Sequence, residues 1–162
     1  MHIGLVSDTH DNLANVERAL TQMRLEGIST LLHAGDVTDA RTLRLFRGFD
    51  LWLARGNMDH DLGLQQAATA VFGAGRLLAS HTIQIDGAAI ALIHRGEGAT
   101  GAQLTSSGMF DYVICGHTHR PQDRWVGTTR VINPGALGNP RWDTPTFAIL
   151  DLATGELRWY SL

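Results

Sequence analysis

The sequence predicts an α/β fold in which parallel strands alternate with helices. Three short apolar runs, over residues 1–6, 29–34 and 50–54, indicate buried strands, and apolar residues at helical spacing separate them. This alternation is typical of a parallel sheet with right-handed crossover connections. Sheets of this kind bind ligands beyond the carboxyl ends of their strands. We therefore expect a site where the residues that follow these three runs meet.

The connecting segments carry ordinary helix signals. The first helix is predicted between Asn12, an N-cap residue, and Gly27, a stop signal. The second is expected to begin at Thr38 or Asp39, with its apolar residues facing inward. Residues 62–77 predict a shorter helix followed by a glycine-rich turn. Each helix follows one of the three predicted strands, which supports the alternating pattern.

From residue 78 onward the sequence predicts mainly hairpins. Runs over 78–85 and 88–93 flank Asp86-Gly87, which is a strong hairpin signal. Further strands are expected over 112–115, 124–126, 130–132, 147–152 and 156–160, with a short helix over 100–108 and a tight loop at 133–136.

Composition indicates one globular domain over residues 1–162. The net charge is −3, which gives no electrostatic reason to expect a nucleic acid polymer or an anionic membrane as partner. No apolar run approaches the ~20 residues of a membrane span. The single cysteine fits a reducing compartment, so we expect a cytoplasmic protein. All thirteen basic residues are arginine, which excludes Schiff-base and P-loop lysine chemistry.

Two histidines follow the strand predicted over 112–115. His117 and His119 are two residues apart, so in an extended segment they point the same way. Neutral imidazole is the commonest protein ligand for metals. Because His-x-His also occurs by chance, its meaning depends on further ligands at other strand ends.

Other predicted strands end in polar side chains of the same kind. The complete set is Asp8, His10, Asp36, Asn57, His94, His117 and His119. Mixed imidazole and carboxylate donors suit Mn, Fe, Zn, Ni or Co better than Ca or Mg. Two such ions ~3.5–4 Å apart bind both oxygens of an in-line displacement and lower the pKa of a bridging water. The sequence therefore predicts a two-metal phosphoester hydrolase.

Two further potential ligands are expected to be structural. His33 lies inside a predicted strand, which is more typical of a hydrogen-bonded core histidine than of a ligand. Cys115 precedes the histidine pair within a strand and is expected to belong to the core.

The motifs also occur in a familiar order. They are Asp8-x-His10, Gly35-Asp36, Gly56-Asn57-x-Asp59, His94 and Gly116-His117-x-His119. This order resembles the signature of the calcineurin-like metallophosphoesterases, and more narrowly the small bacterial and archaeal phosphodiesterases among them. Asn133-Pro134-Gly135 followed by Pro140-Arg141 is similar to the same subgroup. The resemblance covers residues 1–150.

The resemblance implies a four-layer α/β/β/α sandwich, with two mixed sheets flanked by helices and a dimetal site at the sheet edge. One ion would be held by Asp8, His10, Asp36 and His119, and the other by Asp36, Asn57, His94 and His117. Asp36 would bridge the two ions, Mn being the leading choice, and a hydroxide between them would attack a small organic or nucleotide-type phosphodiester. Asp36, Asn57, Asp59 and His60 are the candidate catalytic residues.

Two positions depart from the family pattern. Many relatives have a histidine after the motif asparagine, where it protonates the leaving oxygen and pairs with Asp59. This chain has Met58 there, and His60 is either a substitute or an exposed loop histidine. His94 is followed by Arg95-Gly96-Glu97, where relatives often have His-Gly-His.

Several arginines flank the motifs and are candidate ligands of the substrate phosphate. They are Arg55, Arg95, Arg120 and Arg141, although an all-arginine chain places some there by chance. Trp142 is a candidate for stacking on a nucleobase or for lining an interface.

Three alternatives stay open. The chain is also compatible with a phosphomonoesterase or a protein phosphatase, against which Met58 argues mildly. It is compatible with a non-catalytic scaffold like the retromer subunit of this fold, against which the complete ligand set argues. A homodimer through hairpin edges and Trp159-Tyr160 is a further possibility.

Overall fold

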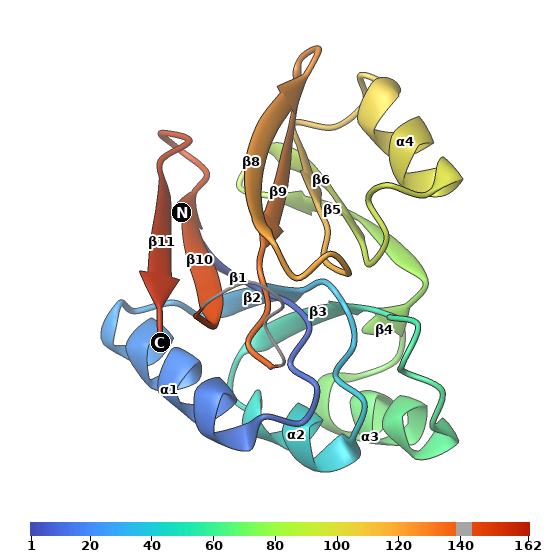
Figure 1. Cartoon of the computed structure of the whole chain (residues 1–162), viewed down its shortest axis with the longest axis vertical. Coiled ribbons are helices and arrows are strands. Elements are labelled where there is room, and N and C mark those ends of the chain that lie inside the picture. Colours follow the sequence, from blue (N-terminus) through green and yellow to red (C-terminus); the bar gives the residue numbers. More distant parts are fainter. Residues whose placement is uncertain (139–143) are drawn as a thin grey trace.

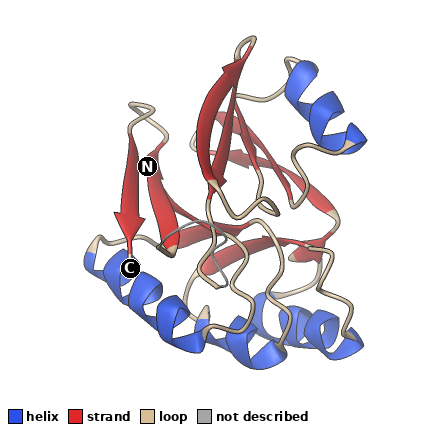
Figure 2. Cartoon of the chain, in the orientation of Figure 1, coloured by secondary structure: helices blue, strands red, loops and turns tan. Residues whose placement is uncertain are grey.

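The computed structural model describes residues 1–138 and 144–162. Two β-sheets pack face to face, and helices cover their outer sides (Figures 1 and 2). From bottom to top of Figure 1 the layers are three helices, a six-stranded sheet, a five-stranded sheet and one helix. This arrangement confirms the predicted four-layer sandwich of two mixed sheets.

The six-stranded sheet contains the three strands that open the chain. Its order is β11-β10-β1-β2-β3-β4. Strands β1 to β4 run parallel, β10 is antiparallel to β1, and β11 is antiparallel to β10. Its elements are β1 (His2–Val6), β2 (Thr30–His33), β3 (Asp50–Ala54), β4 (Leu77–Leu78), β10 (Thr146–Asp151) and β11 (Leu157–Ser161), and its helices are α1 (Leu13–Leu25), α2 (Ala40–Leu45) and α3 (Leu62–Phe72).

The five-stranded sheet has the order β5-β6-β7-β9-β8. Strands β6, β7 and β9 are parallel, and β5 and β8 are antiparallel to their neighbours. Its elements are β5 (Ser80–Ile85), β6 (Ala88–Ile93), β7 (Tyr112–Ile114), β8 (Pro121–Val126) and β9 (Thr129–Pro134), and its outer face carries α4 (Ala99–Ser106).

Local signals account for the element boundaries. The side chains of Asn12, Asp39 and Asp61 each accept a hydrogen bond from a backbone N–H in the first turn of α1, α2 and α3. In the turn between β5 and β6, Asp86 and Gly87 have φ values of 50° and 83°, as a tight hairpin requires. The predicted caps at Asn12 and Asp39 and the predicted Asp86-Gly87 turn are confirmed, whereas the cap at Asp61 was not predicted.

One predicted strand is divided between the two sheets. The run expected over 78–85 is broken at Ala79: Leu77–Leu78 pairs with β3 in one sheet, and Ser80–Ile85 pairs with β6 in the other. The strand pattern alone does not reveal this switch, since no glycine or proline between Leu78 and Ile85 marks a break. A second correction concerns Asn133 and Pro134, which end β9 instead of forming a loop.

Alternating side chains fill three apolar layers. Along β1, Val6 packs against α1, α2 and α3, whereas Ile3 and Leu5 face the second sheet. The middle layer joins the two sheets, and a smaller third layer lies beneath Leu104 of α4. Together these layers fix the strand ends relative to one another.

The longest helix, α1, has 13 residues. None of the helices in residues 1–138 and 144–162 has the length and apolar character needed to cross a bilayer.

Burial of side chains in the middle layer is expected to contribute to stability. Leu5 has no exposed surface, so Leu5→Ala should lower the free energy of unfolding by about 2–5 kcal/mol. Leu25→Ala is the control, because Leu25 is 78% exposed and its truncation should change stability by about 0.5 kcal/mol or less. Urea denaturation measures both, and equal effects would contradict the assignment of Leu5 to the core.

Candidate metal centre

The loops that follow β1, β2, β3, β6 and β7 meet at one edge of the two sheets. Backbone hydrogen bonds join them: Asp8 N–H donates to Gly35 O at 2.9 Å, and Gly116 N–H donates to His94 O at 2.9 Å. All seven predicted ligands lie on these loops or strand ends.

A first group consists of Asp8, His10 and His119. The Nε2 atoms of the two histidines are 3.2 Å apart, and His119 Nε2 lies 3.3 Å from Asp8 Oδ1. Asp8 Oδ2 accepts hydrogen bonds from the Ser7 hydroxyl and from His117 N–H, which turns Oδ1 toward the imidazoles. Oδ1 is buried and makes no hydrogen bond of good geometry within the described residues. Burial by itself raises the pKa of Asp8, but contacts with His119 and Ser7 outweigh it and the pKa is lowered.

A second group lies beside the first and consists of Asn57, His94 and His117. His94 donates its Nδ1–H to Ala34 O at 2.7 Å, which leaves a lone pair on Nε2. That Nε2 lies 3.0 Å from Asn57 Oδ1 and 3.3 Å from His117 Nδ1. Three potential ligand atoms thus converge on one point.

Asp36 lies between the two groups. Its Oδ1 accepts a hydrogen bond of 2.8 Å from Met58 N–H. Its Oδ2 lies 3.7 Å from His10 Nε2 and 3.5 Å from His94 Nε2, so one oxygen faces both groups.

These distances fit metal ions. Two ligand atoms about 2.1 Å from one ion, at ordinary coordination angles, are separated by about 3.0–3.4 Å. The contacts between His10 and His119 and between Asn57 and His94 fall in this range. Within the described chain, Asp8, His10 and His119 form one triad with ligand atoms within 4.8 Å of one another, and Asp8, Asp36 and His94 form another.

The backbone is strained at this site. Among described residues other than glycine, eight have a positive φ, and five of these are candidate ligands. They are Asp8 (51°), His10 (39°), Asp36 (59°), His117 (68°) and His119 (60°). This conformation costs about 1–2 kcal/mol per residue, so packing elsewhere offsets it.

Motif glycines allow the loops to approach. A Cβ on Gly56 would lie 2.1 Å from Asp36 Oδ1, and one on Gly116 would lie 1.9 Å from the Ser7 hydroxyl oxygen and 2.7 Å from Asp8 Oδ2. Any side chain at either position would displace a candidate metal carboxylate.

The sequence of the whole chain matches known proteins. The model of the calcineurin-like phosphoesterase superfamily domain matches residues 1–155. The chain belongs to this superfamily. A phosphodiesterase of Methanocaldococcus jannaschii is 29% identical over 161 residues, which cover 98% of this chain and 97% of the relative.

Solved structures of the superfamily fold agree. A structure described as a novel archaeal phosphodiesterase superposes with a TM-score of 0.92 at 29% identity, over 100% of both chains. Wild-type Vps29 of Entamoeba histolytica, solved with Zn²⁺, has a TM-score of 0.69 at 20% identity, over 100% of this chain and 98% of its own. At 20% identity, the similarity to Vps29 shows a shared fold and nothing further.

Asp59, which the superfamily motif predicts as a catalytic residue, accepts hydrogen bonds from three backbone N–H groups. Its Oδ2 accepts N–H groups from Asp36 at 3.0 Å and Gly56 at 2.8 Å, and its Oδ1 accepts Thr38 N–H at 2.8 Å. The carboxylate is buried and joins the loop after β2 to the loop after β3.

His33 and Cys115 have the structural surroundings expected of them. His33 accepts Gly35 N–H on Nδ1 at 3.1 Å, and its Nε2 lies 3.4 Å from the Thr9 hydroxyl. Burial lowers the pKa of His33 to about 3, so the ring is neutral. Burial likewise raises the pKa of Cys115 to about 12, and its thiol packs in the outer core.

The sequence did not single out two residues that position the ligands. Ser7 fixes Asp8, and Asn133 donates from Nδ2 to Gly116 O at 2.8 Å, which fixes the loop of His117. Ser7 gave no signal in the sequence. Asn133 gave only the family-like Asn-Pro-Gly motif.

The predicted substrate residues differ in their surroundings. Arg55 donates to Asp59 O at 2.9 Å and to the Gln65 side chain, so its guanidinium is engaged. Arg95 is exposed and contacts His117, and Arg120 is exposed. His60 is exposed. Arg141 and Trp142 lie outside the described residues.

A small depression of about 250 Å³ adjoins the centre and is lined by Arg55, Asn57, Ala79, Ile93, His94 and Arg95.

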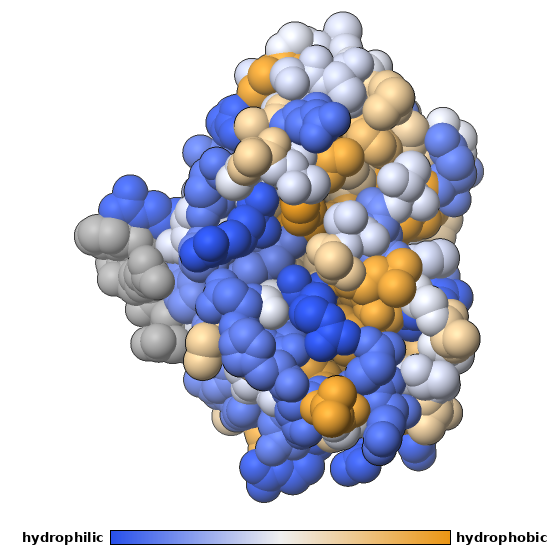
Figure 3. Space-filling model, turned by 90° about the vertical axis from the view of Figure 1, so that its right-hand side faces the viewer, coloured by the Kyte–Doolittle hydropathy of each residue, from blue (hydrophilic) through white to orange (hydrophobic). Residues whose placement is uncertain are grey.

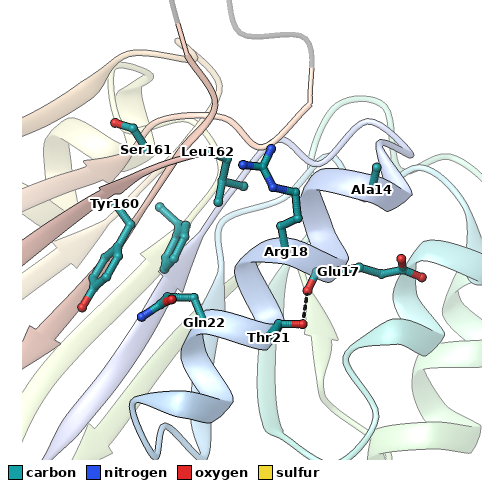
Figure 4. Close-up of a pocket in the computed structure, with 9 residues that line it drawn as sticks. Ala14, Glu17, Arg18, Thr21, Gln22, Tyr160, Ser161 and Leu162 are labelled. Carbon is teal, nitrogen blue, oxygen red and sulfur yellow. Dashed lines mark hydrogen bonds between the residues drawn. The ribbon is translucent and has the colours of Figure 1, made fainter.

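On the side of the molecule that carries α3 and α4, hydrophilic side chains predominate and apolar ones are scattered among them (Figure 3). A larger cavity of about 620 Å³ lies between α1 and the pair β10–β11, and none of its lining residues is a candidate ligand (Figure 4). The centre is therefore defined by its side chains and not by the size of a cavity.

The three amide contacts of Asp59 lead to a prediction. Asp59→Asn replaces one acceptor oxygen by an NH₂ group that faces a backbone donor, so it should lower the free energy of unfolding by about 1–3 kcal/mol. Glu156→Gln is the control, since this exposed carboxylate accepts no backbone hydrogen bond among the described residues. Urea denaturation of metal-free protein compares them, and an unchanged Asp59→Asn variant would refute the positioning role.

Proposed function

We propose that this chain hydrolyses small phosphodiesters at a centre of two divalent metal ions. One observation carries the proposal: Asp36 Oδ2 faces His10 Nε2 at 3.7 Å and His94 Nε2 at 3.5 Å, as a carboxylate shared by two ions must. The names of the phosphodiesterase relative and of the archaeal phosphodiesterase structure support the same activity.

The ligands divide between the two groups. Asp8, His10 and His119 would hold one ion, Asn57, His94 and His117 the other, and Asp36 both. When bound, the two ions supply Lewis-acid activation of water and neutralise phosphate oxygens. Two divalent charges against the carboxylates of Asp8 and Asp36 leave the site positive, which favours an anionic substrate.

The donor set bears on which metal is used. Four imidazoles, two carboxylates and one amide suit Mn, Fe, Zn, Ni or Co better than Ca or Mg. Mn is our leading choice.

The groups around the centre bear on the substrate. The Met58 side chain, which is 51% exposed, has no proton to give. Esters whose leaving group departs without protonation are therefore favoured over alkyl monoesters, which weighs against a phosphomonoesterase or protein phosphatase. A scaffold role would not require the complete ligand set that this chain retains.

The remaining assignments belong to the same proposal. Arg95 and Arg120 are exposed and would contact the substrate phosphate, whereas Arg55 would act by fixing the Asp59 loop. His60 as a substitute acid, a cytoplasmic location and a homodimer stay predictions. Trp159, 40% exposed on the edge strand β11, is the residue that favours a homodimer.

The shared carboxylate gives the first test. Asp36→Ala should lower kcat/KM for a bis-aryl phosphate by more than about a hundredfold with Mn²⁺, because both ions lose a ligand. Glu17→Ala, at an exposed position of α1, is the matched control and should retain full activity. Wild-type hydrolysis that is as fast after metal removal as with Mn²⁺ would sink the proposal.

Met58 gives the second test. Met58→His introduces a proton donor beside Asn57 and should raise the rate on diesters with alkyl leaving groups by roughly tenfold or more. Rates on p-nitrophenyl diesters should be unchanged, since that leaving group needs no proton. Met109→His, at a 69% exposed position on another loop, controls for histidine alone. Equal gains on both kinds of substrate would contradict a general-acid explanation.

A further inference from the structure

The outer ring nitrogen of His117 faces two side chains of opposite charge. Its Nε2 lies 3.2 Å from Arg95 Nε and 3.1 Å from Arg95 Nη2, while Glu97 Oε1 lies 3.6 Å from the same atom. Its Nδ1 points the other way, 3.3 Å from His94 Nε2. Arg95 and Glu97 are both exposed, so each is free to move.

The two neighbours require opposite forms of the ring. A neutral imidazole carries one N–H and one lone pair, a guanidinium only donates, and a carboxylate only accepts. The contact with Arg95 therefore needs the lone pair on Nε2 and the proton on Nδ1. A ring that binds a metal through Nδ1 carries its proton on Nε2, where Glu97 accepts it and Arg95 does not fit.

We propose that Glu97 is the positioning carboxylate of His117 in the metal-bound protein, and that metal binding releases Arg95 from His117 to the substrate phosphate. The inference rests on the function proposed above. Histidines that bind metals usually donate their second N–H to a carboxylate or carbonyl, and losing that partner weakens metal binding 10–100-fold.

The position of Arg95 supports its second role. It lines the depression of about 250 Å³ that it shares with Asn57 and His94, two candidate ligands of the same ion. A guanidinium released there presents a planar pair of donors to phosphate oxygens. The centre would then offer this phosphate contact only after an ion has bound to Asn57, His94 and His117.

The first experiment measures metal binding. Metal-free wild type, Glu97→Gln and Arg95→Gln are titrated with Mn²⁺ by calorimetry. Glu97→Gln should weaken one of two binding steps by roughly 10–100-fold, whereas Arg95→Gln should leave that step equal or tighter, since a competitor for His117 is gone. Glu156→Gln and Arg18→Gln, both at exposed positions, are the controls and should match wild type. Unfolding midpoints of the metal-free variants exclude a general loss of structure.

The second experiment measures phosphate binding. Arg95→Gln should weaken binding of inorganic phosphate to Mn-loaded protein by roughly tenfold or more and should not change binding to metal-free protein. If Glu97→Gln binds both Mn²⁺ ions as tightly as wild type, or if Arg95→Gln weakens phosphate binding equally without metal, the inference is wrong while the proposed function stands. If wild type shows no metal-dependent diester hydrolysis, the proposed function itself fails.

Discussion

Two buried carboxylates, Asp36 and Asp59, hold the centre of this structure together. Asp59 accepts three backbone N–H groups from the loops after β2 and β3, and one of these belongs to Asp36. Asp36 in turn is fixed by Met58 N–H, so that its second oxygen faces both groups of imidazoles. Hydrogen bonds from backbone N–H groups therefore fix the position of each carboxylate.

The strained loops depend on the layers beneath them. Five candidate ligands adopt a left-handed backbone conformation. This conformation is unfavourable for residues other than glycine, so an isolated loop of the same sequence would not keep it. Three apolar layers, with Leu5 and Val6 fully buried on opposite faces of β1, fix where each strand ends. Favourable packing in the sandwich therefore offsets the backbone strain that holds the candidate ligands in place.

The chemistry around the centre is asymmetric. In the first group Asp8 and His119 are buried and His10 is half-buried, whereas in the second group only His94 is buried, Asn57 is exposed and His117 is half-buried. The exposed side is where this chain departs from the pattern of its superfamily. Differences in substrate and in the order of binding would arise there.

The sequence by itself determined much of this protein. Period-3.6 and period-2 patterns, N-caps at Asn12 and Asp39, and the Asp86-Gly87 turn are local, so they predicted most elements correctly. Parallel strands end at a common edge, so polar residues after each strand predicted the candidate ligand set.

Only the tertiary structure decided the features that depend on distant residues. The transfer of the chain between sheets at Ala79 depends on which strand each half pairs with. The hydrogen bond from His117 N–H to Asp8 spans 109 positions in the sequence, and the contacts of Arg95 with His117 span 22. No local pattern encodes such pairs, because they form only when loops from different strands pack at one edge.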